Sequence, residues 1–192
     1  GPKPAEAVRY APLLPPHEGP TVALVIGTSR PAKEWPEVRY AELIDRMHAE
    51  DGARSIIVGG RSPREEEAAA RIAAIAHHPP LDLPQWDLRR VAYLFARADV
   101  VVSPDTGPLH IAVALGTPSV ALIGYTNRKR VGPYRCGELM VDGYGDPGEE
   151  YGFESGYREG RMERISVDEV LRRVRLALER YGESAPGGQA RP

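Results

Sequence analysis

Three small or polar residues, Asp105, Thr106 and Gly107, stand between a predicted strand and a predicted helix. At such a junction the first backbone N–H groups of the helix point outward, and the helix dipole favours a negative charge there. His110 falls on the first turn of the same helix and adds a side-chain N–H donor for the same ligand. These residue types in this order therefore predict a site for phosphate or another anion.

The elements that must position this turn can be predicted from the apolar residues on either side of it. Asp99 to Val102 predicts a buried strand, which we expect to stop at Ser103-Pro104 because proline cannot continue a hydrogen-bonded ladder. Leu109 to Leu115 has a helical pattern, and Gly116 follows where such a helix would end.

Further strands and helices alternate along the chain. Strands are expected at Thr21–Ile26, Ser55–Val58, Leu81–Leu83 (short) and Ser119–Ile123. Helices are expected at Pro36–Glu50, Ser62 to about Ala76, after Asp87 with Leu88, Val91, Leu94 and Phe95 on one face, and Ser166 to about Tyr181. Unbroken apolar strands between helices predict an α/β fold, a Rossmann-like parallel sheet with helices on both faces.

The predicted strands end in glycine and hydroxyl residues. These ends are Gly27-Thr28-Ser29, Gly59-Gly60, 103–107 and Gly124-Tyr125-Thr126. Ligands bind at the carboxyl ends of the strands in sheets of this kind, so we expect these segments to share one site.

Composition limits the classes of function. With 42% hydrophobic residues, the 192-residue chain can form a core, and its net charge of −2 without a basic block argues against nucleic acid. No apolar run approaches the length of about 20 residues that a membrane span needs. A single cysteine, Cys136, excludes an internal disulfide, fits a reducing compartment and is expected to be inert. The pair His77-His78 lacks metal-ligand spacing and is expected to be solvated.

The chain divides into three expected parts. Residues 1–20 contain six prolines and predict an extended arm or interdomain linker. Residues 21–181 form the predicted domain, in which 125–164 is a long loop rich in glycine and tyrosine. Residues 182–192 are expected to be a disordered tail.

Several of these segments together resemble the donor-binding, C-terminal half of the ADP-heptose:lipopolysaccharide heptosyltransferases, glycosyltransferase family 9, which has the GT-B fold. The resemblance is carried by IGTSRPAKEWP at 26–36, VGGRSPRE at 58–65, DTGPLHIA at 105–112, GTPSVALIG at 116–124 and MERISVDEV at 162–170. It spans roughly residues 20–180, and the three motifs within 26–124 occur in the family's order.

The resemblance implies roles at the anion-binding turn. Asp105, Thr106, Gly107 and His110 would hold the donor diphosphate and contact the sugar, and Lys33 would pair with the phosphates. The alternatives are an ordinary helix cap with a polar first-turn histidine, and a solvated loop lysine.

The other implied donor contacts also have structural alternatives. Thr28 and Ser29, after Gly27, could donate hydroxyl hydrogen bonds or serve only their own turn. Glu65 would accept from the ribose hydroxyls, but it also stands where the glutamate of a capping box stands. Trp86 would stack on the nucleobase, or lie half-buried in a surface loop.

The reaction implied is inverting transfer of a sugar from a nucleotide-diphosphate donor, an ADP-linked heptose by resemblance, to a glycan or lipid-linked acceptor such as lipopolysaccharide core. Lys33, His110 and Asp105 are the catalytic residues expected in this chain, with no cofactor and no metal. The acceptor domain and its catalytic base are expected to be missing from this chain. The expected location is the cytoplasm, with the acceptor as a route to peripheral attachment at the inner membrane. The alternatives are a non-catalytic nucleotide or nucleotide-sugar binding module and a GT-B-like nucleotide-sugar epimerase.

Overall fold

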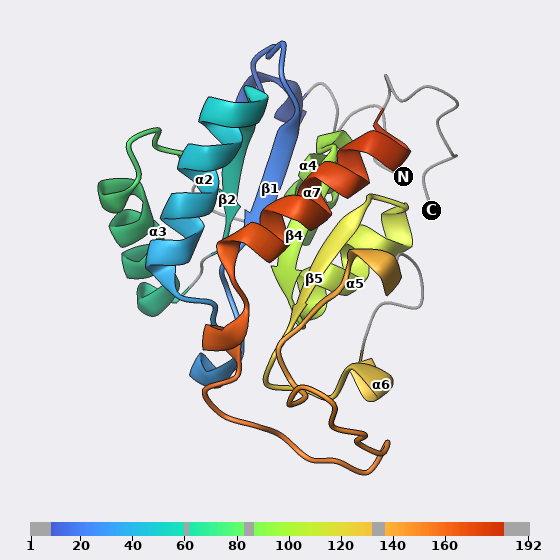
Figure 1. The fold of residues 1–192 in the computed structure, drawn as a ribbon. Helices are drawn as coiled ribbons and strands as arrows, with labels where there is room; N and C mark the ends of the chain where they lie inside the picture. The colour runs from blue at the N-terminus through green and yellow to red at the C-terminus, as the bar shows by residue number, and fades with distance from the viewer. Residues whose placement is uncertain (1–8, 60–61, 83–86, 132–136, 183–192) are drawn as a thin grey trace.

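The chain folds around one parallel sheet (Figure 1). A computed structural model describes residues 9–59, 62–82, 87–131 and 137–182. The sheet has six strands in the order β3-β2-β1-β4-β5-β6, and every neighbouring pair is parallel. The strands are β1 (Thr21–Val25), β2 (Arg54–Val58), β3 (Leu81–Asp82), β4 (Val100–Pro104), β5 (Ser119–Ile123) and β6 (Val141–Asp142). The predicted α/β fold with a parallel sheet is confirmed.

Helices cover both faces of this sheet (Figure 1). One face packs against α2 (Glu37–Asp51), α3 (Pro63–Ile75) and α7 (Val167–Tyr181). The other packs against α4 (Leu88–Arg97) and α5 (Gly107–Leu115). Side chains alternate along each strand, so Leu24 belongs to the first core and its neighbours Ala23 and Val25 belong to the second.

The helix ends follow the local signals in the sequence. Both halves of the Ser62–Glu65 capping box form, and the Asp87 carboxylate accepts from the N–H of Arg90. Gly52 ends α2 with a φ of 61°, a left-handed conformation that glycine adopts without strain. One residue differs from expectation: Leu88 is 72% exposed, because α4 begins with this residue and turns it away from the core.

The predicted stop at Ser103-Pro104 is confirmed in its position, since β4 ends at Pro104, but the expectation that these residues lie outside the ladder was wrong. β4 includes both residues, and Pro104 lies opposite Leu122 of β5. The Val101 N–H donates toward β5, to the carbonyl of Pro118, so by alternation the nitrogen of Pro104 faces β1. The pairing with β1 ends at Val102, and the N–H that proline lacks is therefore not needed.

The glycine- and tyrosine-rich segment 125–164 contains more regular structure than its sequence indicated. It holds α6 (Arg128–Val131), the 3-10 turns Gly137–Leu139 and Met162–Arg164, and the edge strand β6. Tyr144 is fully buried, and its N–H donates to Asp142, so the segment contributes to the core as well as to the surface.

The segment at 9–20 also differs from an extended arm. Tyr10 is 6% exposed, tilts against the ring of Tyr93, and donates to Asp87 at 3.5 Å. Leu13 and Leu14 pack against the same core cluster as Tyr93. The rest of the predicted arm, residues 1–8, and residues 183–192 of the predicted tail lie outside the described residues.

None of the helices in the described parts of the chain has both the length and the hydropathy that a membrane span requires.

Candidate functional site

A cavity of about 660 Å³ opens at the carboxyl ends of β1, β2 and β4. We call it the β1/β4 cavity. The predicted site residues that line it are Gly27, Thr28, Ser29, Lys33, Glu65, Asp105, Thr106, Gly107 and His110. Trp86 and Cys136 lie outside the described residues, and their expected roles are not placed. The parallel topology explains this convergence, since all strand ends meet at one edge of the sheet.

An ion pair between Lys33 and Asp105 forms part of the cavity wall. The Lys33 Nζ lies 2.8 Å from Oδ2 of Asp105 and 2.9 Å from its backbone carbonyl oxygen. The Thr126 hydroxyl donates to the same Oδ2 at 3.0 Å. Asp105 is nearly buried, with 8% of its side chain exposed against 16% for Lys33. The carboxylate therefore holds the ammonium group in one place beside the cavity.

The start of α5 faces the cavity without a side-chain cap. Thr106 is the N-cap residue, but it makes no capping hydrogen bond, and its hydroxyl donates instead to the Pro104 carbonyl at 3.3 Å. The ordinary helix-cap interpretation of Asp105 and Thr106 is thus not realised. Gly107 is exposed, and no atom would lie within 4 Å of a Cβ at this position. The helix start is open to an anion, which its dipole favours.

His110 lies beside this helix start. Its Nε2 is 3.9 Å from Oδ1 of Asp105, and its side chain is 58% exposed. An imidazole in this position can donate a hydrogen bond to a group bound in front of α5.

Glu65 caps α3 and also lines the cavity. Its Oε2 accepts from the Ser62 N–H at 3.3 Å, completing the capping box. Its Oε1 lies on the side of Gly27, where a Cβ would come within 2.3 Å of it. A carboxylate has two oxygens, so capping the helix does not keep Glu65 out of the cavity.

Thr28 uses its hydroxyl within its own turn, which is the structural alternative to a donor contact. Its hydroxyl donates to the Arg30 carbonyl at 2.7 Å, and the residue is 6% exposed. Ser29 is exposed on the cavity rim.

Thr126 is a site residue that reasoning about single motifs missed. Its position after the end of β5 placed it among the predicted strand ends. Its hydrogen bond to Asp105 was not predicted, because the two residues follow different strands. The hydroxyl after a strand-ending glycine was the available signal.

Two features lie outside the site, a tryptophan of the first motif and the pair His77-His78, and the histidines agree with the prediction that they are solvated. Trp35 is a core residue, 2% exposed, and its Nε1 donates to the Ile165 carbonyl. The His77 and His78 side chains are 87% and 45% exposed and contact Asp45. Within the described ranges, no group of three or more potential ligands is arranged to hold a metal ion.

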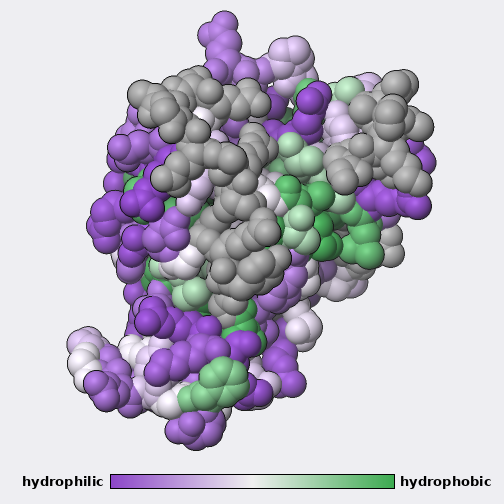
Figure 2. All heavy atoms as spheres, turned by 90° about the vertical axis from the view of Figure 1, so that its right-hand side faces the viewer, coloured by the Kyte–Doolittle hydropathy of each residue, from purple (hydrophilic) through white to green (hydrophobic). Residues whose placement is uncertain are grey.

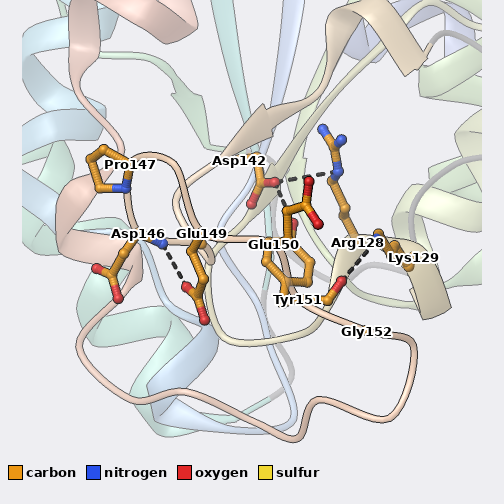
Figure 3. A pocket seen from close by; sticks show the side chains of 10 residues that line it. Arg128, Lys129, Asp142, Asp146, Pro147, Glu149, Glu150, Tyr151 and Gly152 are labelled. Atoms are coloured by element: carbon orange, nitrogen blue, oxygen red, sulfur yellow. Dashed lines mark hydrogen bonds and ion pairs between the residues drawn. The ribbon is translucent and has the colours of Figure 1, made fainter.

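A second cavity, of about 900 Å³, is lined by the segment between β6 and the turn at 162–164. Figure 3 shows Arg128 and Tyr151 turned toward Asp142, to which they are joined by an ion pair of 3.4 Å and a hydrogen bond of 2.7 Å. Asp146 pairs with Arg161 and Arg164. Three carboxylates here, Asp142, Asp146 and Glu149, are paired with arginines, and no predicted site residue lines this cavity.

Comparison with known proteins agrees with the resemblance noticed in the sequence. The model of glycosyltransferase family 9 (heptosyltransferase) matches residues 3–141. Lipopolysaccharide heptosyltransferase 1 of Escherichia coli K12 is 35% identical over 136 residues, which cover 71% of this chain and 42% of that protein.

Solved structures show the same likeness. A glycosyltransferase family 9 protein of Veillonella parvula has a TM-score of 0.78 at 21% identity, covering 93% of this chain and 52% of that one, and it shows the fold alone. E. coli heptosyltransferase WaaC, solved with ADP, has a TM-score of 0.66 at 29% identity, covering 89% of this chain and 48% of that one. The chain therefore spans about half the length of these structures and about two fifths of the curated relative.

Proposed function

Because the chain belongs to glycosyltransferase family 9, we propose that its β1/β4 cavity binds the nucleotide-diphosphate part of a sugar donor. The observation that carries this proposal is the placement of the Lys33 ammonium beside the uncapped start of α5. A cation and a helix N-terminus on one wall suit a diphosphate, which carries several negative charges.

The chemistry proposed for this wall is stabilisation of the leaving group. When the bond between the sugar and the diphosphate breaks, negative charge grows on the departing phosphate oxygen. Lys33, the backbone N–H of Gly107 and the imidazole of His110 would stabilise that charge with little rearrangement, since Asp105 already holds Lys33 in place. In this proposal the protein supplies the stabilising charge without a metal ion.

The nucleoside would extend from the diphosphate toward Glu65, whose carboxylate can accept from both hydroxyls of a ribose. An ADP-linked heptose is the donor we favour. A relative of this chain, E. coli heptosyltransferase WaaC, was solved with ADP and also with ADP-2-deoxy-2-fluoro heptose. Trp86 stays a proposed base contact.

The acceptor hydroxyl needs a base, and we propose that this base comes from outside the described residues. Asp105 is engaged by Lys33 and Thr126, and Glu65 is the residue proposed for the ribose. Direct attack of the activated hydroxyl opposite the diphosphate would invert the sugar carbon. The acceptor proposed is lipopolysaccharide core, because the curated relatives are named for lipopolysaccharide and one of them, of Haemophilus influenzae, for its core.

Nucleotide titration tests the donor site. ADP, UDP and GDP are titrated into the chain by calorimetry, and ADP is expected to bind with a 1:1 stoichiometry. Lys33→Ala should weaken ADP binding about ten-fold or more, because a hydrogen bond to a charged group contributes about 1.5–3 kcal/mol. His110→Ala should weaken it less, since His110 is the more exposed donor.

Lys129→Ala is the matched control. Lys129 bonds the Tyr151 carbonyl at the wall of the other cavity, and its loss should leave ADP affinity unchanged. No binding of any of the three nucleotides, or equal losses in Lys33→Ala and Lys129→Ala, would contradict the proposed donor site.

A further inference from the structure

A smaller chamber adjoins the β1/β4 cavity on the side of α6. It has a volume of about 120 Å³ and shares Lys33, Asp105 and Val131 with the larger cavity. Its lining also includes two arginines and a tyrosine, Arg30, Arg130 and Tyr157. We call it the side chamber. Its volume corresponds to about four waters, enough for a carboxylate or phosphate group but too little for an oligosaccharide.

The charge on the side chamber is positive. Arg30, Lys33 and Arg130 line it against one carboxylate, Asp105, which Lys33 already pairs at 2.8 Å. In the described part of the chain, neither the Arg30 nor the Arg130 guanidinium has a carboxylate partner. Arg158 and Arg161, on the neighbouring segment, are by contrast paired with Glu149 and Asp146.

The chamber wall is held by contacts to the sheet. The ring of Tyr157 stacks on Tyr125 with centroids 4.9 Å apart and an angle of 7° between the planes. The Arg30 guanidinium lies 5.7 Å from the centre of the Tyr157 ring, a cation–π distance. Tyr125 follows the end of β5, and its carbonyl accepts from the Arg158 N–H. These contacts place the Arg30 guanidinium over an exposed aromatic ring beside the chamber.

The backbone at Arg130 is anchored as well. Its backbone N–H donates to the carbonyl of Asn127, a residue that is 2% exposed. The Asn127 amide donates in turn to the Gly152 carbonyl at 2.8 Å, joining α6 to the segment that carries Tyr157. Figure 2 shows that the lower end of the face in view is mostly hydrophilic, with a few hydrophobic side chains among the polar ones.

We propose that the side chamber binds an oxyanion substituent, carboxylate or phosphate, of the sugar acceptor, with Arg30 and Arg130 as its ligands. Guanidinium groups suit both oxyanions because they can donate two parallel hydrogen bonds. The assignment to the acceptor rests on the proposed donor site. Lys33, proposed for the diphosphate, lines both cavities, whereas Glu65, proposed for the ribose, lines only the larger one. The side chamber therefore faces the end of the donor that carries the sugar.

The test uses three small sugars as probes. Glucose 6-phosphate, glucuronate and glucose are titrated into the chain with saturating ADP and again without it. Both charged sugars should bind more tightly than glucose, and the ratio between them shows which oxyanion the chamber prefers. Arg30→Gln and Arg130→Gln should each weaken the preferred charged sugar about ten-fold and change ADP affinity less than two-fold. Arg172→Gln, an exposed arginine on α7, is the control and should change neither.

Three results would overturn the proposal: charged sugars that bind no better than glucose, charged sugars that compete with ADP, or arginine variants that lose ADP binding equally. If ADP itself fails to bind, the donor-site proposal fails, while the titration without ADP still decides whether Arg30 and Arg130 bind the oxyanion.

Discussion

At the scale of single residues, the site depends on the Asp105 carboxylate. It accepts hydrogen bonds from Lys33 and Thr126, and its 8% exposure leaves it little contact with water. A carboxylate in that position needs its partners, because an unpaired buried charge is costly. Asp105 therefore acts as a positioning residue that keeps Lys33 beside the start of α5.

A double-mutant cycle measures this dependence. Lys33→Met should lower the free energy of unfolding by about 1–3 kcal/mol, because Asp105 keeps only the Thr126 donor. Adding Asp105→Asn removes the buried charge and should restore part of that loss. Urea denaturation measures the free energy of unfolding of the two single variants, Lys33→Met and Asp105→Asn, and of the double variant. A loss in the double variant equal to the sum of the two single losses would contradict the coupling.

Gly107 tests the open helix start. Gly107→Ala should leave the fold intact, since no atom lies within 4 Å of the added Cβ. It should still weaken ADP binding several-fold, because that Cβ would stand where the proposed diphosphate meets α5. Gly137→Ala, at another glycine with open space but away from the cavity, should change neither property. Thermal denaturation and calorimetry would show both, and unchanged ADP affinity in Gly107→Ala would place the diphosphate elsewhere.

At the scale of elements, local signals predicted the parts with strong periodicity. The strands β1, β2 and β5 and the helices α2, α3, α4 and α7 lie within about a residue or two of their expected bounds. The misses have tertiary causes. β4 continues through Pro104 because β5 runs beside it, and β6 is too short to show a pattern before it pairs with β5.

The position of the site could be predicted from the parallel sheet itself. Residues after each strand end had to converge, and the motifs around Lys33 and Asp105 marked two of those ends. The bond from Thr126 to Asp105 depends on side-chain geometry, which spacing along a sequence does not contain. The same holds for the position of Glu65, which caps α3 and also lines the cavity.

Gly124, just after the end of β5, packs closely against the turn at 162–164. A Cβ there would lie 2.7 Å from the Met162 sulfur and 2.8 Å from its backbone nitrogen. Gly124→Ala should therefore lower the free energy of unfolding by about 1–3 kcal/mol. Denaturant unfolding would measure it, and an unchanged midpoint would show that this turn moves aside freely.

At the scale of the whole molecule, an ion-pair network holds the segment between β6 and α7. The hydrogen bond from Arg158 lowers the pKa of Glu149 to about 2, from an ordinary value of 4.5. Hydrogen bonds from Arg161 and Arg164 hold the pKa of Asp146 well below its usual range. A carboxylate with a lowered pKa in the folded state stabilises the fold above its unfolded pKa, and that contribution is lost as pH falls toward the folded value.

The network should therefore weaken in acid. Between about pH 5 and pH 2 the melting temperature should fall, and amide protons of residues 142–161 should exchange faster before those of β1 and β4 do. Glu149→Gln should reduce the pH dependence in this window. A flat melting temperature from pH 5 to pH 2 would contradict the role of these ion pairs.

The most direct test of the donor site is a structure of the chain with ADP bound. We predict the diphosphate between the Lys33 ammonium and the start of α5, in contact with the Gly107 N–H, and the ribose beside Glu65. A diphosphate bound instead among the arginines of the cavity in Figure 3, or away from Lys33 altogether, would contradict the account.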